Sequence, residues 1–455
     1  MGGPVTRSAT LTRSGEQRVV SNVAKGSIGN LIEWYDWYTY AAFSVYFAAT
    51  FFPQGDMTAQ LLNTAAVFAV GFLMRPIGGW LLGRFADRFG RRAALTGSVT
   101  MMALGSLLIA VTPGYSVIGV AAPIMLVFAR LLQGLSVGGE YATSATYLSE
   151  VASAGRRGFY SSFQYVTLIA GQLIALGLQI VLQVLLTEQQ LTSWGWRIAF
   201  GIGALGAVVA MYLRRSMDES ASFRAEAERA GGSASSRGEL RVLLRYPREC
   251  LLVAGLTLGG TVAFYTYTTY LQKFMHLTSG IPNDTVTLIN FIALVVFVAL
   301  QPIAGSLSDR IGRRPLLLFF GIGGTVLTVP LLTLLAGTSN PFSGFVIMLA
   351  GLVIVSGYTS INAIVKAELF PTNIRALGVG LPYALTVAIF GGTTEYIALA
   401  LKNAGHESVF FYYVAGCVLI SLIVYGSMRE TSHNSPLDTT SVPGSERAEA
   451  ITSSG

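Results

Sequence analysis

Four ionisable side chains stand inside long apolar segments of this chain, where a charge is costly. Glu33 and Asp36 lie in the first such segment, Arg75 in the second and Arg130 in the fourth. A charge at the centre of a bilayer costs at least about 2.5 kcal/mol on insertion scales, so each of these groups needs a partner or a task. Acids and bases held together away from water can bind a proton and an anion. The four residues therefore predict an internal site that couples a proton to an anionic small molecule.

The central hypothesis concerns Asp36 and Arg130. We expect them to form an ion pair across an internal cavity, because protonation of the carboxyl group would remove the attraction and leave the cation free for a substrate anion. The alternative is a structural ion pair that fixes the register of two helices. Glu33 shares a helix face with Asp36 and is a second candidate for the proton. It could instead pair with Arg75.

The predicted substrate site extends beyond these charges. Arginine offers a planar pair of donors that fits an anionic oxygen pair, and Arg75 and Arg130 are the deepest such groups. Lys366, at the end of the tenth apolar segment, is either a further contact or a loop cation. Any single polar or aromatic neighbour could equally be a packing residue. The other predicted contacts are Gln133, Gln164, Tyr165, Tyr267, Tyr270, Gln301 and Asn362.

Membrane helices must position these groups. Charged residues make up 12% of the chain, hydrophobic residues 52%, and the mean hydropathy is +0.58, whereas a soluble domain has about 25% charged residues. Twelve continuous apolar stretches are each near the ~20 residues that a helix needs to cross a bilayer. Backbone groups in lipid must be satisfied internally, which favours helices. We predict an all-α membrane protein with transmembrane helices at 27–52, 61–83, 93–113, 117–142, 159–187, 196–213, 250–274, 286–308, 315–336, 343–365, 376–401 and 408–427.

The basic residues predict the orientation, because Lys and Arg in short loops stay cytoplasmic. With the N-terminus inside, most of the 30 Lys and Arg fall on the cytoplasmic side, and Arg197, Lys273 and Lys402 fall toward the outside. Both termini are then cytoplasmic. The net charge of +7 describes loops that face anionic lipid headgroups, and no nucleic-acid surface is expected.

A ten-residue string occurs twice, as GRFADRFGRR (Gly83 to Arg92) and as GSLSDRIGRR (Gly305 to Arg314). Each copy lies between two apolar segments, so the chain is predicted to consist of two homologous six-helix halves. The predicted organisation is a cytoplasmic tail (1–26), a first half (27–213), a cytoplasmic linker (214–249), a second half (250–428) and a disordered cytoplasmic tail (429–455).

The duplicated loops are also candidate gates. Glu150 and Arg157 recur at the same spacing as Glu368 and Arg375. Charge-assisted pairs at these loops could close the cytoplasmic side in one conformation and release it in another. The alternative is a basic loop with a tight glycine turn that only sets topology. The predicted gating residues are Asp87, Arg88, Arg91, Glu150, Arg157, Asp309, Arg310, Arg313, Glu368 and Arg375.

The duplicated string G-x-x-x-D-R-x-G-R-R resembles the signature loop of the major facilitator superfamily. Four further segments are similar to the metabolite:proton symporter family within it: GNLIEWYDWYTY (29–40), FLMRPIGGWLLGRFADRFGRR (72–92), RLLQGLSVGGEYATSATYLSE (130–150) and AELFPTNIRALGVG (367–380). Members that carry α-ketoglutarate resemble the chain further, through GFYSSFQYVTLIAGQL (158–173), FYTYTTYLQKF (264–274), YTSINAIVKAE (358–368) and AIFGGTTEYIALALK (388–402). The resemblance covers roughly residues 20 to 428.

The resemblance implies a proton-coupled symporter that imports α-ketoglutarate across the bacterial inner membrane by alternating access. The first-span acid and fourth-span arginine look like those of proton-coupled sugar carriers. Arg75 and Pro76 belong to a motif shared by carriers whose substrates have a carboxylate in common, so Arg75 either contacts that group or only holds Glu33. The alternatives are another small carboxylate or zwitterion, such as citrate, shikimate, proline or betaine, and a transporter-like metabolite sensor.

An enzyme is not expected. The chain lacks the nucleotide-binding string G-x-x-x-x-G-K-[ST], and His276, His406 and His433 all lie outside the apolar segments. Cys250 and Cys417 have no spacing that suggests a disulfide or a metal site. We therefore expect no cofactor, no metal and no catalytic residue, and a monomer whose partners are membrane lipid, protons and an anionic small molecule.

Overall fold

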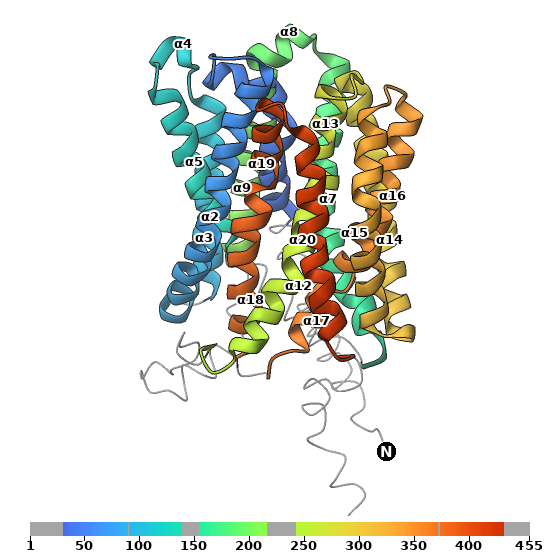
Figure 1. Cartoon of the computed structure of the whole chain (residues 1–455). Coiled ribbons are helices and arrows are strands. Elements are labelled where there is room, and N and C mark those ends of the chain that lie inside the picture. The colour runs from blue at the N-terminus through green and yellow to red at the C-terminus, as the bar shows by residue number, and fades with distance from the viewer. Residues whose placement is uncertain (1–30, 90, 139–153, 216–242, 372–373, 432–455) are drawn as a thin grey trace, which may run out of the picture.

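The computed structural model describes residues 31–89, 91–138, 154–215, 243–371 and 374–431. Within these ranges it describes no side chain for residues 83, 86–88, 91, 92, 95, 154, 213–215 and 376. The described chain is a bundle of long helices that run side by side, with α4 and α8 at one end and α17 at the other (Figure 1). None of the described residues forms a strand.

The helices of the first half follow the predicted apolar segments. They are residues 31–51, α2 (Met57–Phe89), α3 (Arg91–Val111), α4 (Tyr115–Ile118), α5 (Ala121–Val137), the 3-10 turn η1 (Ala154–Arg156), α7 (Arg157–Leu185), α8 (Glu188–Gln190), the π-helical η2 (Leu191–Gly195) and α9 (Trp196–Arg215). The end of the predicted fourth span, after Gly138, lies outside the described residues.

The helices of the second half also follow the predicted apolar segments. They are α12 (Pro247–Tyr265), the π-helical η3 (Thr266–Tyr270), α13 (Leu271–Leu277), α14 (Asn283–Ile311), α15 (Arg313–Ala336), α16 (Pro341–Thr359), α17 (Asn362–Ala367), α18 (Arg375–Thr386), the π-helical η4 (Val387–Gly391), α19 (Gly392–Asn403) and α20 (Glu407–Ser427).

By length and hydropathy, nine helices of the described chain could each cross a membrane, and two shorter apolar helices cover Thr96–Val111 and Ala121–Val137. Together with helix 31–51 they match all twelve predicted spans. The all-α membrane fold is therefore confirmed. Exposed apolar side chains such as Val184, Leu205 and Phe342 cover the outside of the bundle, where a lipid-facing surface needs them.

Two seams join the halves. One is formed by α7 and α14, and the other by α2 with η4 and α19. Within the first half α2 crosses α5, and within the second half α12 and α15 pack on α20. The first helix and α12 both carry many fully buried residues. These two helices therefore bring side chains of both halves to the centre of the bundle.

The crossing of α2 and α5 is unusually close. A Cβ atom added to Gly134 of α5 would lie 2.1 Å from the carbonyl oxygen of Gly71 on α2, so this position can only hold glycine. The same is true one turn further, where a Cβ on Gly138 would lie 2.1 Å from the carbonyl oxygen of Arg75. This contact places the arginine of α2 beside the arginine of α5.

Candidate functional site

Arg75 and Arg130 meet on one aromatic ring in the first half. The guanidinium carbon of Arg75 lies 4.1 Å from the ring centroid of Trp37, and that of Arg130 lies 4.2 Å from it. Arg130 is 0% exposed and Arg75 6%. A tryptophan face attracts a desolvated cation, which explains how two buried positive charges are held so close. We call Trp37, Arg75 and Arg130 the arginine cluster.

A chain of hydrogen bonds connects the arginine cluster to Asp36. Arg130 donates from Nη1 to Gln133 Oε1 at 2.7 Å, and Gln133 donates from Nε2 to Asp36 Oδ2 at 2.8 Å. Ser106 of α3 donates to the same Asp36 oxygen. The amide of Gln133 therefore contacts the acid with its nitrogen and the base with its oxygen, and it links the two charged groups.

The predicted direct ion pair between Asp36 and Arg130 is therefore wrong for this conformation, because Gln133 lies between the two groups. The physical reason is the spacing on α5: Gln133 is one turn from Arg130 and can reach both side chains. The other oxygen of Asp36, Oδ1, has no hydrogen-bond partner in the described part of the chain. It faces Gly203 of α9, where an added Cβ would lie 2.3 Å from it.

Glu33 is buried, with 1% of its surface exposed, but it does not hold Arg75. No ion pair between them occurs among the described residues, and the Arg75 guanidinium lies instead over Trp34, Trp37 and Phe72. The predicted alternative of a Glu33–Arg75 pair is therefore wrong for this conformation. Arg75 remains available for another anion.

Both arginines present the same unused edge. In the described chain, Nε and Nη2 of Arg75 and Nε and Nη2 of Arg130 are buried without a hydrogen-bond partner. These two nitrogens form the side of a guanidinium that binds a carboxylate with two parallel hydrogen bonds. Buried donors without partners are costly, so the arrangement fits an anionic oxygen-rich ligand.

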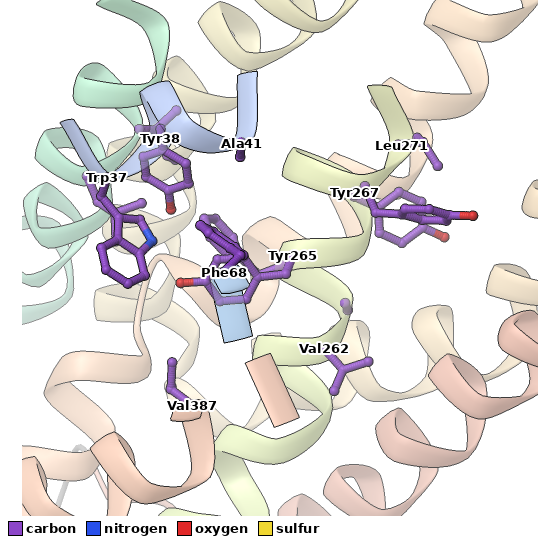
Figure 2. Packing of buried hydrophobic residues seen from close by; sticks show 14 of the residues in the cluster. Trp37, Tyr38, Ala41, Phe68, Val262, Tyr265, Tyr267, Leu271 and Val387 are labelled. Atoms are coloured by element: carbon purple, nitrogen blue, oxygen red, sulfur yellow. The ribbon is translucent and has the colours of Figure 1, made fainter. Parts of the chain in front are cut away.

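Aromatic groups from both halves surround this edge. Trp37 and Tyr38 of the first helix and Tyr265 of α12 turn toward one another in Figure 2. The ring of Tyr265 packs edge-on against Phe72 at 5.2 Å, and Phe72 in turn lies under the Arg75 guanidinium at 4.0 Å. The arginine cluster therefore lies at the contact between the two halves, where a ligand would touch both.

The other predicted substrate contacts are more scattered. Tyr165 packs edge-on against Phe264 across the two halves at 5.2 Å, and Gln164 is buried beside it on α7. Tyr267, Tyr270 and Gln301 satisfy neighbours within the second half instead: Tyr267 reaches Thr328 at 3.4 Å, Tyr270 reaches Glu407 at 3.4 Å, and Gln301 donates to Phe297 in its own helix at 3.2 Å. In this conformation these three side chains bond within the second half, and their role in substrate binding remains a prediction.

Lys366 is not a loop cation. It lies in α17, is 0% exposed, and donates to Asn362 Oδ1 at 2.9 Å. Its ammonium group lies 4.0 Å from the ring centroid of Tyr383. The structure thus brings two predicted contacts, Lys366 and Asn362, together, but in the second half near the end of the bundle that holds α17.

The ion pair between Lys273 of α13 and Glu395 of α19 was not predicted from the sequence. Their side chains are 3% and 5% exposed and lie in direct contact. The prediction that Lys273 lies toward the outer side of the membrane concerns the orientation of the chain and remains a prediction; the structure adds that its side chain is buried in the bundle. The available signal was Glu395, an acid within an apolar segment that needs a cation nearby. Ser106 and Trp37 gave no comparable signal, since neither carries a charge.

The duplicated loop of the second half makes a contact between the halves. Asp309 of α14 accepts hydrogen bonds from the backbone N–H groups of Gly158 (2.7 Å) and Phe159 (2.9 Å) in the first turn of α7. A carboxylate at a helix N-terminus is favoured by the helix dipole. Arg313 donates to the same acid at 2.8 Å and lies 3.8 Å from Glu368. We call the end of the bundle that holds these residues the basic end.

The remaining predicted gating residues divide into three groups. Arg375 donates to the carbonyl oxygens of Ala367 (3.1 Å) and Phe370 (3.2 Å), and Arg157 is buried near Glu368. Arg310 is exposed and takes part in none of the described ion pairs. Glu150 and the side chains of Asp87, Arg88 and Arg91 lie outside the described residues. Gating by these loops remains a prediction.

The Asp309 contact leads to a testable prediction. Asn in place of Asp309 weakens two charge-assisted hydrogen bonds, so the basic end should open more often, by about tenfold. Ser162 lies buried in this seam beside Gly305. In a Cys250→Ser, Cys417→Ser background, Ser162→Cys should therefore react with a maleimide about tenfold faster when Asp309→Asn is added.

The matched control for this prediction is Asp284→Asn at the other end of α14. Asp284 is exposed and bonds only to Thr285 beside it among the described contacts, so its replacement should leave the labelling rate unchanged. Equal rates in both backgrounds would mean that Asp309 does not hold the seam closed.

Comparison with known proteins agrees with this geometry. The Major Facilitator Superfamily matches residues 27–393. The chain is 51% identical to the alpha-ketoglutarate permease of Escherichia coli over 92% of this chain and 96% of that protein, and 33% identical to the citrate-proton symporter of Klebsiella pneumoniae over 89% and 90%. Its fold matches a solved structure of a proton:xylose symporter with a TM-score of 0.73 at 18% identity, over 93% of this chain and 99% of that one.

The bundle consists of membrane-length helices and has a buried polar contact between its halves. Together with the bacterial relatives, these features identify a multi-pass membrane transporter. The chain belongs to the Major Facilitator Superfamily. The prediction of a transporter rather than an enzyme is thereby confirmed, because the named relatives are a permease and a symporter.

Proposed function

We propose that the protein is a symporter that imports α-ketoglutarate together with protons. The observation that carries the proposal is the pair of unused guanidinium edges of Arg75 and Arg130, held on Trp37 where the two halves meet. A 2-oxo acid offers two carboxylate oxygens and a neighbouring carbonyl oxygen to such donors. The 51% identity to an alpha-ketoglutarate permease supports this substrate.

Proton coupling is assigned to Asp36. A proton on this acid, at the partner-free Oδ1, would remove the charge that holds the Gln133 amide. Gln133 would then be held less tightly, and Arg130, which donates to its Oε1, would lose the indirect attraction of the carboxylate and be freer to bind a substrate anion. Proton binding and substrate binding thus favour each other, as symport requires.

Alternating access is supported by contacts between the halves at both ends. At the basic end, Ile364 donates its backbone N–H to Ser161 of α7 at 3.0 Å. At the opposite end, Asn283 of α14 donates to the Tyr46 hydroxyl at 2.8 Å, and Gln183 of α7 donates to Thr287 of α14 at 3.2 Å. We propose that these two sets break in turn, so that the arginine cluster faces one side of the membrane at a time.

The proposal includes the organisation of the chain. The basic end faces the cytoplasm of the bacterium, at its inner membrane, and both termini lie on that side. The halves extend over 27–213 and 250–428, with the linker 214–249 and the tails 1–26 and 429–455 cytoplasmic. The transporter works as a monomer surrounded by lipid.

The test is uptake of labelled α-ketoglutarate into proteoliposomes. With the membrane potential held at zero, an inward pH difference of one unit should drive about tenfold accumulation if one proton enters with each substrate, because one pH unit corresponds to about 1.4 kcal/mol. Without the pH difference, only equilibration is expected. Accumulation that does not depend on the pH difference would contradict symport.

The same assay separates the alternatives. Unlabelled citrate, shikimate, proline and betaine should each compete less well than α-ketoglutarate, and stronger competition by one of them would identify the true substrate. A metabolite sensor would bind a ligand without transport. Counterflow of labelled substrate in the absence of any gradient excludes that possibility.

A further inference from the structure

We propose that Lys273 binds the second carboxylate of the substrate and so makes the site specific for dicarboxylates. This inference rests on the proposed function, in which the arginine cluster takes the 2-oxo acid end. It concerns the pair Lys273–Glu395, which the mechanism described so far does not use. The pair joins α13 and α19 of the second half, and α19 packs against α2, the helix that carries Arg75.

The ammonium group of Lys273 has spare hydrogen-bonding capacity. A lysine ammonium carries three donors, and the described contacts of Lys273 consist of the one to Glu395 Oε1. The second oxygen of Glu395 is buried without a hydrogen-bond partner in the described chain. Lys273 can therefore donate a hydrogen bond to a substrate carboxylate while Glu395 holds its ammonium group in place.

Phe72 of α2 lies between the two charged groups. The guanidinium carbon of Arg75 lies 4.0 Å from the Phe72 ring centroid. On the other side, Glu395 lies one turn along α19 from Gly392, where an added Cβ would lie 2.5 Å from Cβ of Phe72. The arginine cluster and Lys273–Glu395 are therefore neighbours across the contact between the halves. Three carbon atoms separate the carboxylates of α-ketoglutarate, which is a span of the same order.

Local backbone geometry supports a ligand-binding role for the pair. Lys273 follows the π-helical segment η3, and Glu395 follows η4. A π-helical turn is rare and shifts the side chains that follow it, and such turns occur frequently at functional sites. A π-helical turn precedes each member of the pair. Such turns can orient an acid and a base toward the same point inside a membrane.

A purely structural ion pair is the competing explanation, and a neutral double variant separates the two. Lys273→Gln combined with Glu395→Gln replaces the ion pair by amides of similar size that can hydrogen-bond to each other. It avoids the uncompensated buried charge that either single variant would leave. The double variant should therefore fold, which thermal unfolding in detergent checks.

The experiment compares two ligands in binding assays on the purified full chain. One is α-ketoglutarate, and the other is 2-oxopentanoate, which has the same five carbons with a methyl group in place of the second carboxylate. Wild type should bind α-ketoglutarate about 10 to 100 times more tightly, as expected for a charge-assisted hydrogen bond. In the double variant this ratio should fall to about one, with the affinity for 2-oxopentanoate unchanged.

Lys402→Gln is the matched control, because Lys402 of α19 forms a partly exposed ion pair at 3.3 Å with Glu407 of α20. It should keep the wild-type ratio. If the double variant keeps the wild-type ratio of the two affinities, or loses affinity for both ligands equally, Lys273 does not bind the second carboxylate. Failure of wild type to bind α-ketoglutarate at all would instead overturn the proposed function.

Discussion

Asp36→Asn should abolish accumulation of substrate while exchange across the membrane continues. Asn is close in size to Asp and can still accept a hydrogen bond from Gln133, so the first helix keeps its packing. It cannot take up a proton between the two sides of the membrane. In proteoliposomes with a one-unit pH difference, the accumulation ratio should fall from about ten to about one. Counterflow of labelled against unlabelled α-ketoglutarate should persist, because it needs only the loaded transporter.

Two variants give this prediction its controls. Ser106→Ala removes one hydrogen bond to Asp36 but leaves the carboxyl group, so accumulation should be slower and still reach a ratio near ten. Glu33→Gln tests the second candidate for the proton, which lies on the same helix. If Glu33→Gln removes the pH-driven accumulation and Asp36→Asn does not, the proton is carried by Glu33 and the role of the Gln133 relay is wrong.

The fold could be predicted from the sequence because lipid leaves few choices. Continuous apolar stretches of membrane length must be helices, and the structure places a helix at each of the predicted stretches. The duplicated loop indicated two halves, since a repeat with the same flanking segments arises from one repeated fold. These inferences use only segment length and composition, which a sequence states directly.

The candidate site could be predicted only in part, for physical reasons that differ between residues. Asp36 and Arg130 were found because a buried charge is conspicuous in an apolar segment. Their connection through Gln133 could not be predicted. The side chain that lies between the two charges depends on the rotation of α5 relative to the first helix. A sequence gives the spacing along one helix but not the rotation of one helix against another.

Lys273 illustrates the same limit at the end of a span. Its position near the end of the predicted seventh segment gave no sign of a partner, whereas in the structure it follows the π-helical segment η3 and contacts Glu395. A π-helical turn changes the face on which later residues lie. A periodicity of 3.6 residues therefore assigns the wrong face beyond such a turn, and the ion pair becomes visible only in the structure.

Arg130→Lys should lower the initial uptake rate at low substrate concentration by about 100-fold. Lysine keeps the positive charge but lacks the two parallel donors, and it cannot contact Gln133 and a carboxylate in the same geometry. Loss of a bidentate, desolvated contact of this kind is worth about 2 to 3 kcal/mol. Arg75→Lys should act in the same direction, because its Nε and Nη2 donors form the second unused edge.

Arg197→Lys is the matched control for these arginine variants. Arg197 belongs to the same half, but it donates to the carbonyl oxygens of Ala110 (2.7 Å) and Thr112 (2.8 Å) at the end of α3, away from the arginine cluster. Its replacement should change the uptake rate by less than about twofold, since it removes only a partly exposed contact.

Since Lys273 is proposed to hold the other end of the substrate, the arginine variants should weaken the binding of α-ketoglutarate and of 2-oxopentanoate alike. Uptake near the wild-type rate in both Arg130→Lys and Arg75→Lys would show that the charge alone suffices, and that the paired donors on Trp37 do not recognise the carboxylate.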